Sequence, residues 1–340
     1  MGARSGAGQP FNHLLGEVIA LVARIATSIT ITAMYTPHLV SRSEILSIRG
    51  HAYHVRHWGR DDAPKLWMLH GWMDASPTFQ FVVDAFSRDW HVLAPDWRGF
   101  GLSAWNAGSY YFPDYLADLD ALLAHYCPQA PVRLVGHSMG GMVAMMYAGI
   151  RPERVSRLVS IDGFGLLDLT PDLAPQRYAQ WLQECAQPPG FAPVADPEHF
   201  ASRLIRRNPH LTLDRARFLT EHLTALDANG VRRHLADPRH KMVNPVLYRL
   251  EEAKACWRAI RCPVQWIIGG GASDHPLTGK IKASLAERAA CFADLEQLTV
   301  YDSGHMVQQE QPEQVAQAIE RFMAPTRCAD PVAAHARSEN

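Results

Sequence analysis

The sequence predicts an α/β fold with a mostly parallel central sheet, helices on both faces and a helical insertion after the sixth strand. From residue 44 onward, short apolar runs alternate with helical patterns, as in mainly parallel sheets. This alternation stops between residues 163 and about 255 and then resumes. Apolar residues make up 47% of the 340 residues and charged residues 20%, so the chain can bury a sizeable core.

The individual elements follow from apolar runs and helical periodicity. A β-hairpin turning at Gly50 begins the predicted sheet, and Pro312 marks the first turn of the last helix. The expected strands are 44–49, 52–57, 65–69, 91–94, 132–136, 155–161, 263–268 and 297–301. The expected helices are 76–87, 113–126, 139–150 and 311–323.

These elements divide the chain into a core and an insertion. Residues 41–162 and 256–325 are expected to form the core, and 163–255 a helical lid. Ligands of open α/β sheets bind at the carboxyl ends of the strands, so an insertion that leaves strand 155–161 would cover that region. The polar tail 326–340 is expected to be disordered.

The first 40 residues are expected to be an N-terminal extension. Residues 14–34 are rich in apolar side chains, but Glu17 and Arg24 interrupt the run, which disfavours a spanning helix and a cleavable signal peptide. The expectation is a soluble cytoplasmic protein. The alternatives are an amphipathic segment over 11–34 that attaches the protein to a membrane surface, a weak anchor, a mobile extension, or a mature chain beginning at Met34.

Charge and cysteine usage exclude several classes of protein. Lys plus Arg (33) nearly balance Asp plus Glu (34), so no basic excess is available for nucleic-acid binding. The six cysteines form no C-x-x-C pair, which indicates free thiols in a reducing compartment. His51, His54 and His57 recur every three residues, but on a strand the last two face opposite ways, so no metal site is predicted.

The strongest chemical signal is Gly136-His137-Ser138-Met139-Gly140, which follows an apolar strand and opens a helix. This is the context of the G-x-S-x-G nucleophile elbow. Its serine occupies a strained strand-to-helix turn, where Cβ atoms at 136 and 140 would collide with neighbouring backbone. The pattern predicts Ser138 as a nucleophile.

A nucleophilic serine also needs a base and donors for the oxyanion. His305 lies in the loop between the last strand and the C-terminal helix, which makes it the candidate base. The segment His70-Gly71-Trp72 follows strand 65–69. The backbone N–H groups of Trp72 and Met139 are the candidate oxyanion-hole donors.

With these motifs in this order, residues 44–325 resemble the α/β-hydrolase fold superfamily, and its serine hydrolase-like and esterase/lipase branch most. The matching pieces are His70-Gly71, the segment 96–103 (Asp-Trp-Arg-Gly-Phe-Gly-Leu-Ser), the elbow, the insertion and Gly304-His305. The resemblance implies a Ser–acid–His order along the chain and a structural role for the segment 96–103.

Two aspartates satisfy that order. Asp274 follows strand 263–268, the commoner location; it lies two residues later than the usual spacing from Gly269, although Gly271 restores that spacing. Asp162 ends strand 155–161, where haloalkane dehalogenases and some other members of the superfamily place their acid. Either carboxylate could orient the imidazole of His305. Spacing favours Asp162, and the choice between the two stays open at this point.

The predicted activity is hydrolysis of a small or medium apolar carboxylic ester through an acyl-enzyme, without metal or organic cofactor. Trp72, His137, Met142 and Phe164 are the expected substrate-binding residues, and their apolar and aromatic character favours an apolar substrate. A serine rather than an aspartate at 138 excludes dehalogenase and epoxide hydrolase chemistry. The alternatives are a carbon–carbon bond hydrolase, a thioesterase, a perhydrolase or a non-catalytic binding protein. The only expected partner is the small-molecule substrate, and the chain is expected to be a monomer or a homodimer.

Overall fold

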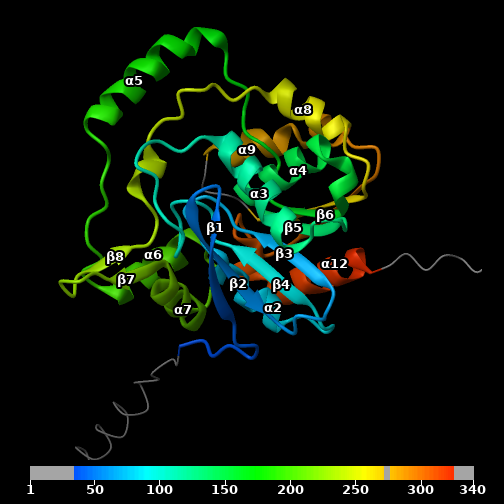
Figure 1. Cartoon of the computed structure of the whole chain (residues 1–340), viewed down its shortest axis with the longest axis horizontal. Coiled ribbons are helices and arrows are strands. Elements are labelled where there is room, and N and C mark those ends of the chain that lie inside the picture. Colours follow the sequence, from blue (N-terminus) through cyan, green and yellow to red (C-terminus); the bar gives the residue numbers. More distant parts are fainter. Residues whose placement is uncertain (1–33, 272–275, 325–340) are drawn as a thin grey trace, which may run out of the picture.

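A computed structural model describes residues 34–271 and 276–324 and places a single eight-stranded sheet at the centre of the molecule (Figure 1). The strand order is β1-β2-β4-β3-β5-β6-β9-β10. Both pairings of β2, with β1 and with β4, are antiparallel, and the remaining pairs are parallel. The predicted mostly parallel sheet is therefore confirmed. The strands are β1 (Arg42–Ile48), β2 (His51–Trp58), β3 (Lys65–Leu69), β4 (His91–Pro95), β5 (Val132–His137), β6 (Val155–Ile161), β9 (Val264–Gly269) and β10 (Leu295–Val300).

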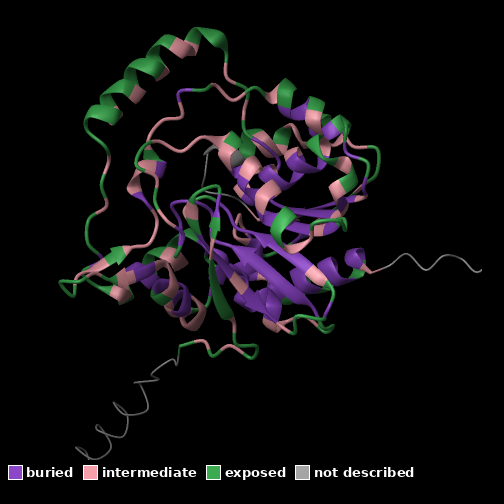
Figure 2. Cartoon of the chain, in the orientation of Figure 1, coloured by how far each residue is buried: buried purple, intermediate pink, exposed green. Residues whose placement is uncertain are grey.

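Helices cover both faces of the sheet, and each face has its own apolar cluster. On one face α3 (Phe112–Tyr126), α4 (Met139–Ile150) and α8 (Leu250–Arg258) pack on the sheet. On the other face α2 (Gln80–Asp84) and α12 (Pro312–Met323) do so. The inner strands from β2 to β9 are deeply buried between these helices, whereas the edge strands β1 and β10 are largely exposed (Figure 2). The remaining core helices are η1 (Ser76–Phe79), η2 (Pro152–Arg154), α9 (Pro276–Ala283), α10 (Leu285–Ala289) and α11 (Val307–Glu310).

The segment between β6 and β9 differs in two respects from the helical insertion that we expected there. It contains a small antiparallel hairpin, where no strand was expected. In addition, the predicted boundary at residue 255 falls inside α8, which packs against α4 and belongs to the core. The elements of the insertion are η3 (Pro171–Leu173), α5 (Ala174–Ala186), α6 (Pro197–Arg207), α7 (Leu213–Leu223), β7 (Thr224–Leu226), β8 (Arg232–His234) and η4 (Pro238–Lys241).

The two halves of the insertion are attached to the core differently. The pair α6–α7 forms an apolar cluster with Phe81 of α2, to which the ring of Tyr35 adds an edge-on contact at 4.8 Å. By contrast, α5 buries none of its residues and lies at the rim of the molecule (Figures 1 and 2). The α6–α7 half is thus a fixed part of the structure.

Three sequence-based expectations concern residues that the structure does not describe. The extension before residue 34, the tail after residue 324 and the loop that holds Asp274 lie outside the described residues. Within residues 34–271 and 276–324, no helix combines the length and the apolar character that a membrane span requires.

Candidate active site

The carboxyl edge of the sheet brings three predicted residues into one hydrogen-bonded chain. Ser138 follows β5, Asp162 follows β6 and His305 lies in the loop after β10. The Oγ of Ser138 is 2.9 Å from Nε2 of His305, and Nδ1 of that ring is 2.9 Å from Oδ2 of Asp162. Because an ionised carboxylate can only accept, Nδ1–H donates to Asp162 and Nε2 accepts the hydroxyl proton of Ser138. Asp162 thus occupies the position of the acid, whereas Asp274 lies outside the described residues.

The backbone at Ser138 has the geometry of a nucleophile elbow. Its φ of 50° and ψ of −116° place a non-glycine residue in a sparsely populated region. The flanking glycines permit the close approach that this turn needs. A Cβ on Gly136 would overlap the backbone of Gly140, and a Cβ on Gly140 would overlap the carbonyl oxygen of Leu69. The predicted collisions are therefore present.

Two backbone contacts from the neighbouring strand orient the carboxylate of Asp162. Its N–H donates to the carbonyl oxygen of Ile267 (2.9 Å), and its Oδ1 accepts from the N–H of Gly269 (3.0 Å). Both partners belong to β9. The residue is 6% exposed. The second carboxylate oxygen is left for His305, so the acid is held in place by the sheet itself.

The His305 loop is held from two sides. The N–H of Gly304 donates to Oε2 of Glu310 (2.5 Å), and Nε2–H of His137 donates to the carbonyl oxygen of His305 (2.9 Å). Burial, assisted by repulsion from His305, lowers the pKa of His137 well below its ordinary value, so this ring stays neutral. The side chain of His305 itself is 38% exposed. Substrate can therefore reach the base.

The predicted substrate contacts of His137 and Phe164 are wrong in this structure. His137 is 1% exposed and lies behind the base, where it supports the His305 carbonyl. Phe164 is 3% exposed because its ring packs on Trp266, with ring centres 4.9 Å apart. Met142 is half-buried in the first turn of α4, and its contact with substrate stays a prediction.

The loop that carries the first predicted oxyanion donor passes directly beside the serine. A Cβ on Gly71 would lie 3.1 Å from Cβ of Ser138. The preceding His70 fixes the loop, since Nδ1–H donates to the carbonyl of Gly71 (2.7 Å) and Nε2 accepts from the N–H of Trp97 (2.9 Å). Burial lowers the pKa of His70 to about 4, so it performs both roles as a neutral ring.

The second predicted donor stands at the start of α4. Met139 is the first residue of that helix. The first N–H groups of a helix have no acceptor within the helix and carry its positive dipole. This position is consistent with the predicted role of the Met139 N–H as the second oxyanion donor, which stays a prediction.

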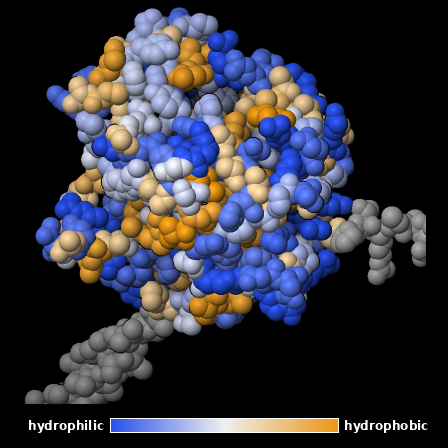
Figure 3. All heavy atoms as spheres, viewed as in Figure 1, coloured by the Kyte–Doolittle hydropathy of each residue, from blue (hydrophilic) through white to orange (hydrophobic). Residues whose placement is uncertain are grey.

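The side chain of Trp72 connects the loop after β3 to the insertion by a hydrogen bond. It is 54% exposed, and its indole N–H donates to the carbonyl oxygen of His240 in η4 (3.2 Å). The ring of His240 is stacked between Phe100 and Tyr110, with ring centres 3.7 and 3.6 Å apart. Apolar residues gather near the centre of the face that Figure 3 shows.

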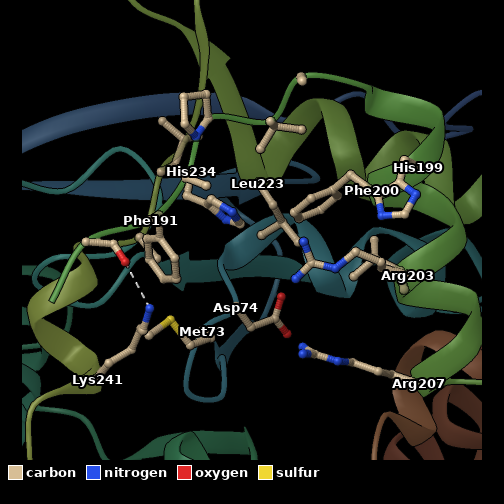
Figure 4. Close-up of a pocket in the computed structure, with 18 of the residues that line it drawn as sticks. Met73, Asp74, Phe191, His199, Phe200, Arg203, Arg207, Leu223, His234 and Lys241 are labelled. Atoms are coloured by element: carbon tan, nitrogen blue, oxygen red, sulfur yellow. Dashed lines mark hydrogen bonds between the residues drawn. The ribbon is translucent and has the colours of Figure 1, made fainter.

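A cavity of about 760 Å³ lies between the loop that holds Met73 and Asp74 and the insertion (Figure 4). It lies between the loop 72–74, the segment 190–196, helix α6 and the hairpin β7–β8. The wall of the cavity includes the loop 72–74 but not the side chains of Ser138 or His305. A cavity of this size can accommodate a medium-sized organic group.

Sequence reasoning missed one acidic residue of this cavity, Asp74. The residue is 5% exposed; its Oδ1 accepts from the N–H of Ala75 (2.9 Å), while Oδ2 has no partner within residues 34–271 and 276–324. Burial raises the pKa of Asp74 to about 7. Its position two residues after Trp72, a predicted site residue, could have indicated that Asp74 lies near the site.

Sequence reasoning also missed Arg203 and Arg207, which line the same cavity from α6. Nothing in the local sequence distinguishes them from the insertion's other arginines, because their position depends on how α6 folds back over the core.

Comparisons with known proteins agree with this architecture. The family model of the alpha/beta hydrolase fold matches residues 64–312. A serine hydrolase-like protein of Danio rerio is 26% identical over 281 residues, which cover 79% of this chain and 84% of the relative. Lipase LipV of Mycobacterium tuberculosis is 28% identical, with 80% and 98% covered.

A solved structure, the thioesterase domain from the curacin biosynthetic pathway, shares the fold with a TM-score of 0.73 at 21% identity. It covers 82% of this chain and 99% of its own. Together with the family match over most of the core, these findings show that the chain belongs to the α/β-hydrolase fold family.

Proposed function

We propose that this protein is a serine-dependent hydrolase of carboxylic esters that acts through an acyl-enzyme. The observation that carries the proposal is the chain of hydrogen bonds from Ser138 through His305 to Asp162, with the serine in a strained turn at a helix N-terminus. Each of these features has a defined use in acyl transfer.

The reaction proceeds in two halves. The Ser138 oxygen attacks the ester carbonyl carbon while His305 Nε2 takes the hydroxyl proton, and the N–H groups of Trp72 and Met139 stabilise the oxyanion. His305 then protonates the leaving alcohol as the carbon–oxygen bond breaks, which leaves an acyl-serine. A water molecule attacks this acyl group, His305 takes its proton, and the acid departs as the proton returns to Ser138. Asp162 stabilises the imidazolium in both halves.

The insertion acts in this proposal as the lid that completes the substrate site. Two features support the role: the cavity lies between the insertion and the loop 72–74, and that loop touches the elbow. The names of the relatives include a lipase, which supports an ester as substrate. Thioester, carbon–carbon and perhydrolase chemistry use the same set of residues and are separated from ester hydrolysis by substrate tests.

The first experiment measures the intact mass of the full chain after exposure to a fluorophosphonate probe, with Ser138→Ala as the control. A single adduct on the wild type that is absent from the variant is the expected result. A series of p-nitrophenyl esters then defines the acyl-chain length. An equal adduct on Ser138→Ala would overturn the assignment of the nucleophile, and the absence of both adduct and turnover would favour a binding protein.

A further inference from the structure

Two arginines of the cavity lack an acidic partner. Arg203 and Arg207 lie one turn apart on α6, and Figure 4 shows both side chains extending from that helix into the space that faces Asp74. Across residues 34–271 and 276–324, neither guanidinium has a carboxylate or carbonyl acceptor within hydrogen-bond distance; Arg203 lies over the ring of Phe200 at 5.8 Å. Two positive groups therefore face the cavity with free donors.

Their position in the cavity wall distinguishes the pair from the other arginines of the insertion. Most of these donate to a carboxylate or to a backbone carbonyl within the described part of the chain: Arg177, Arg215, Arg217, Arg232, Arg233 and Arg239. Arg206 has no such partner there either, but it lies outside the cavity wall. Arg203 and Arg207 are exposed to solvent, and their donors are open to an anion that enters the cavity.

The other charged groups around the cavity do not fill this role. Lys241 donates to the carbonyl of Gly190 (3.0 Å) and lies 4.3 Å from the ring centre of Phe191, so it forms part of the wall. Asp196 caps α6 by accepting from the N–H of Glu198 (2.9 Å). Asp74 makes no ion pair with either arginine, and burial raises its pKa to about 7, so its negative charge is largely absent below neutral pH.

Aromatic rings supply much of the remaining wall. The ring of His234 is stacked on Phe191 with centres 4.3 Å apart and meets Phe200 edge-on at 5.3 Å. The cavity thus combines an apolar and aromatic lining with one cationic side and has the reacting serine beyond the loop 72–74. This distribution fits an elongated molecule that is apolar along its length and negatively charged at one end.

We propose that Arg203 and Arg207 bind an anionic group, a carboxylate or a phosphate, of the substrate at a distance from the scissile bond. The proposal rests on the proposed ester hydrolysis and names its substrate class: esters with an apolar chain and an anionic end. Guanidinium groups donate paired N–H groups to such anions and select them through both charge and geometry. The anion can belong to the acyl group or to the alcohol, and substrates of both kinds separate these cases.

The test compares charged and neutral esters of the same length. The acyl-side pairs are the mono-p-nitrophenyl esters of adipic, suberic and sebacic acid against their methyl-capped diesters. The alcohol-side pair is 4-carboxyphenyl octanoate against its methyl ester. We expect about a tenfold to hundredfold higher kcat/KM for the charged member of at least one pair, as charge-assisted hydrogen bonds provide. The double variant Arg203→Gln/Arg207→Gln should abolish this ratio by lowering kcat/KM of the charged esters to the level of their neutral counterparts.

Arg206→Gln is the matched control, since Arg206 is exposed like Arg203 and Arg207 and lies in the same helix but is not part of the cavity wall. It should leave the ratio unchanged. Equal kcat/KM for charged and neutral esters in every pair, or an equal loss of the ratio in Arg206→Gln, would overturn the proposal.

Calorimetry keeps this test independent of catalysis. Monomethyl suberate is titrated into the wild type and into the double variant. If the fluorophosphonate probe labels nothing, the proposed hydrolysis fails, yet binding that the double variant loses would still support the anion site. Absence of binding to the wild type, together with an absent charge ratio, would refute it.

Discussion

Two groups of residues in the described structure each link a serine, a histidine and an aspartate by hydrogen bonds in that order. In the candidate active site, Ser138 bonds to His305 at 2.9 Å and His305 to Asp162 at 2.9 Å. At the edge of the sheet, Ser43 Oγ lies 2.9 Å from Nε2 of His54, whose Nδ1 lies 2.7 Å from Oδ2 of Asp96. By distance alone, the two groups are equivalent.

The surroundings of the two groups differ. Ser43 lies in the edge strand β1 and pairs in regular register with Arg56, so neither a strained turn nor a helix start is present at that serine. His54 is fully buried, and Asp96 also accepts from the N–H groups of Ser76 (2.7 Å) and Leu102 (2.9 Å). The second group of hydrogen bonds therefore links β1 and β2 to the loop that follows β4. A reactive serine therefore needs free backbone donors, an accessible base and a cavity in addition to the hydrogen bonds.

Removal of the two serine hydroxyls is the strongest test of this contrast. Ser138→Ala should lower kcat by about 10⁴- to 10⁶-fold and abolish fluorophosphonate labelling, because the nucleophile is lost. Ser43→Ala should retain both within about twofold. Peptide mapping of the labelled wild type checks the assignment, and an adduct on Ser43 would show that connectivity alone is sufficient.

Replacing the two acids should separate catalysis from stability. Asp162→Asn should lower kcat by about 10⁴-fold through the wrong imidazole tautomer, with a small change in the melting temperature. Asp96→Asn should leave kcat nearly unchanged but lower the free energy of unfolding by about 1–3 kcal/mol, since a buried hydrogen-bonded acceptor is altered. Chemical denaturation of both variants measures the change in the free energy of unfolding, and steady-state kinetics measures the change in kcat. Similar kinetic losses in the two would remove the distinction.

Two buried carboxylates should affect stability with opposite dependence on pH. Burial alone would raise the pKa of Asp96, but the hydrogen bonds from His54 and the Leu102 N–H, together with attraction to the nearby histidines, outweigh it and lower the pKa. Its stabilisation is therefore present above about pH 4 and lost in acid. Burial raises the pKa of Asp74 from 3.8 to about 7, so the wild type loses stability as pH rises from 4 to 7.

Asp74→Asn should therefore increase the free energy of unfolding at pH 8 by on the order of 3 kcal/mol, with little gain at pH 4. Denaturant midpoints across this pH range measure the difference between variant and wild type. A gain that is independent of pH would contradict the account.

The elbow itself can be disturbed without touching a reacting group. Gly140→Ala introduces a Cβ that overlaps the carbonyl oxygen of Leu69, so we expect about 1–3 kcal/mol lower stability and a reduced labelling rate. Gly108→Ala, at a position with nothing within 4 Å of an added Cβ, is the control and should behave as the wild type. Normal labelling of Gly140→Ala would mean that the tight turn is not needed to expose the serine.

The parts of the site that sequence predicted are those set by local pattern. Ser138, Asp162 and His305 each follow an apolar strand, and parallel strands deliver their carboxyl ends to one edge, so proximity followed from chain order. Phe164 and His137 were misjudged because burial depends on partners remote in sequence, here Trp266 and the His305 carbonyl. The hairpin β7–β8 was missed for a related reason, since its strands have three residues each.

The bond between Trp72 and His240 has a consequence for protein engineering. In the proposed mechanism the backbone of Trp72 donates to the oxyanion, while its side chain hydrogen-bonds to the insertion. Substrate selection by the insertion and stabilisation of the oxyanion would then depend on the same residue. Libraries that vary η4 to broaden specificity would therefore also alter turnover. Specificity and rate are more easily tuned separately from α6, which packs on α7 and makes no hydrogen bond to Trp72 within the described residues.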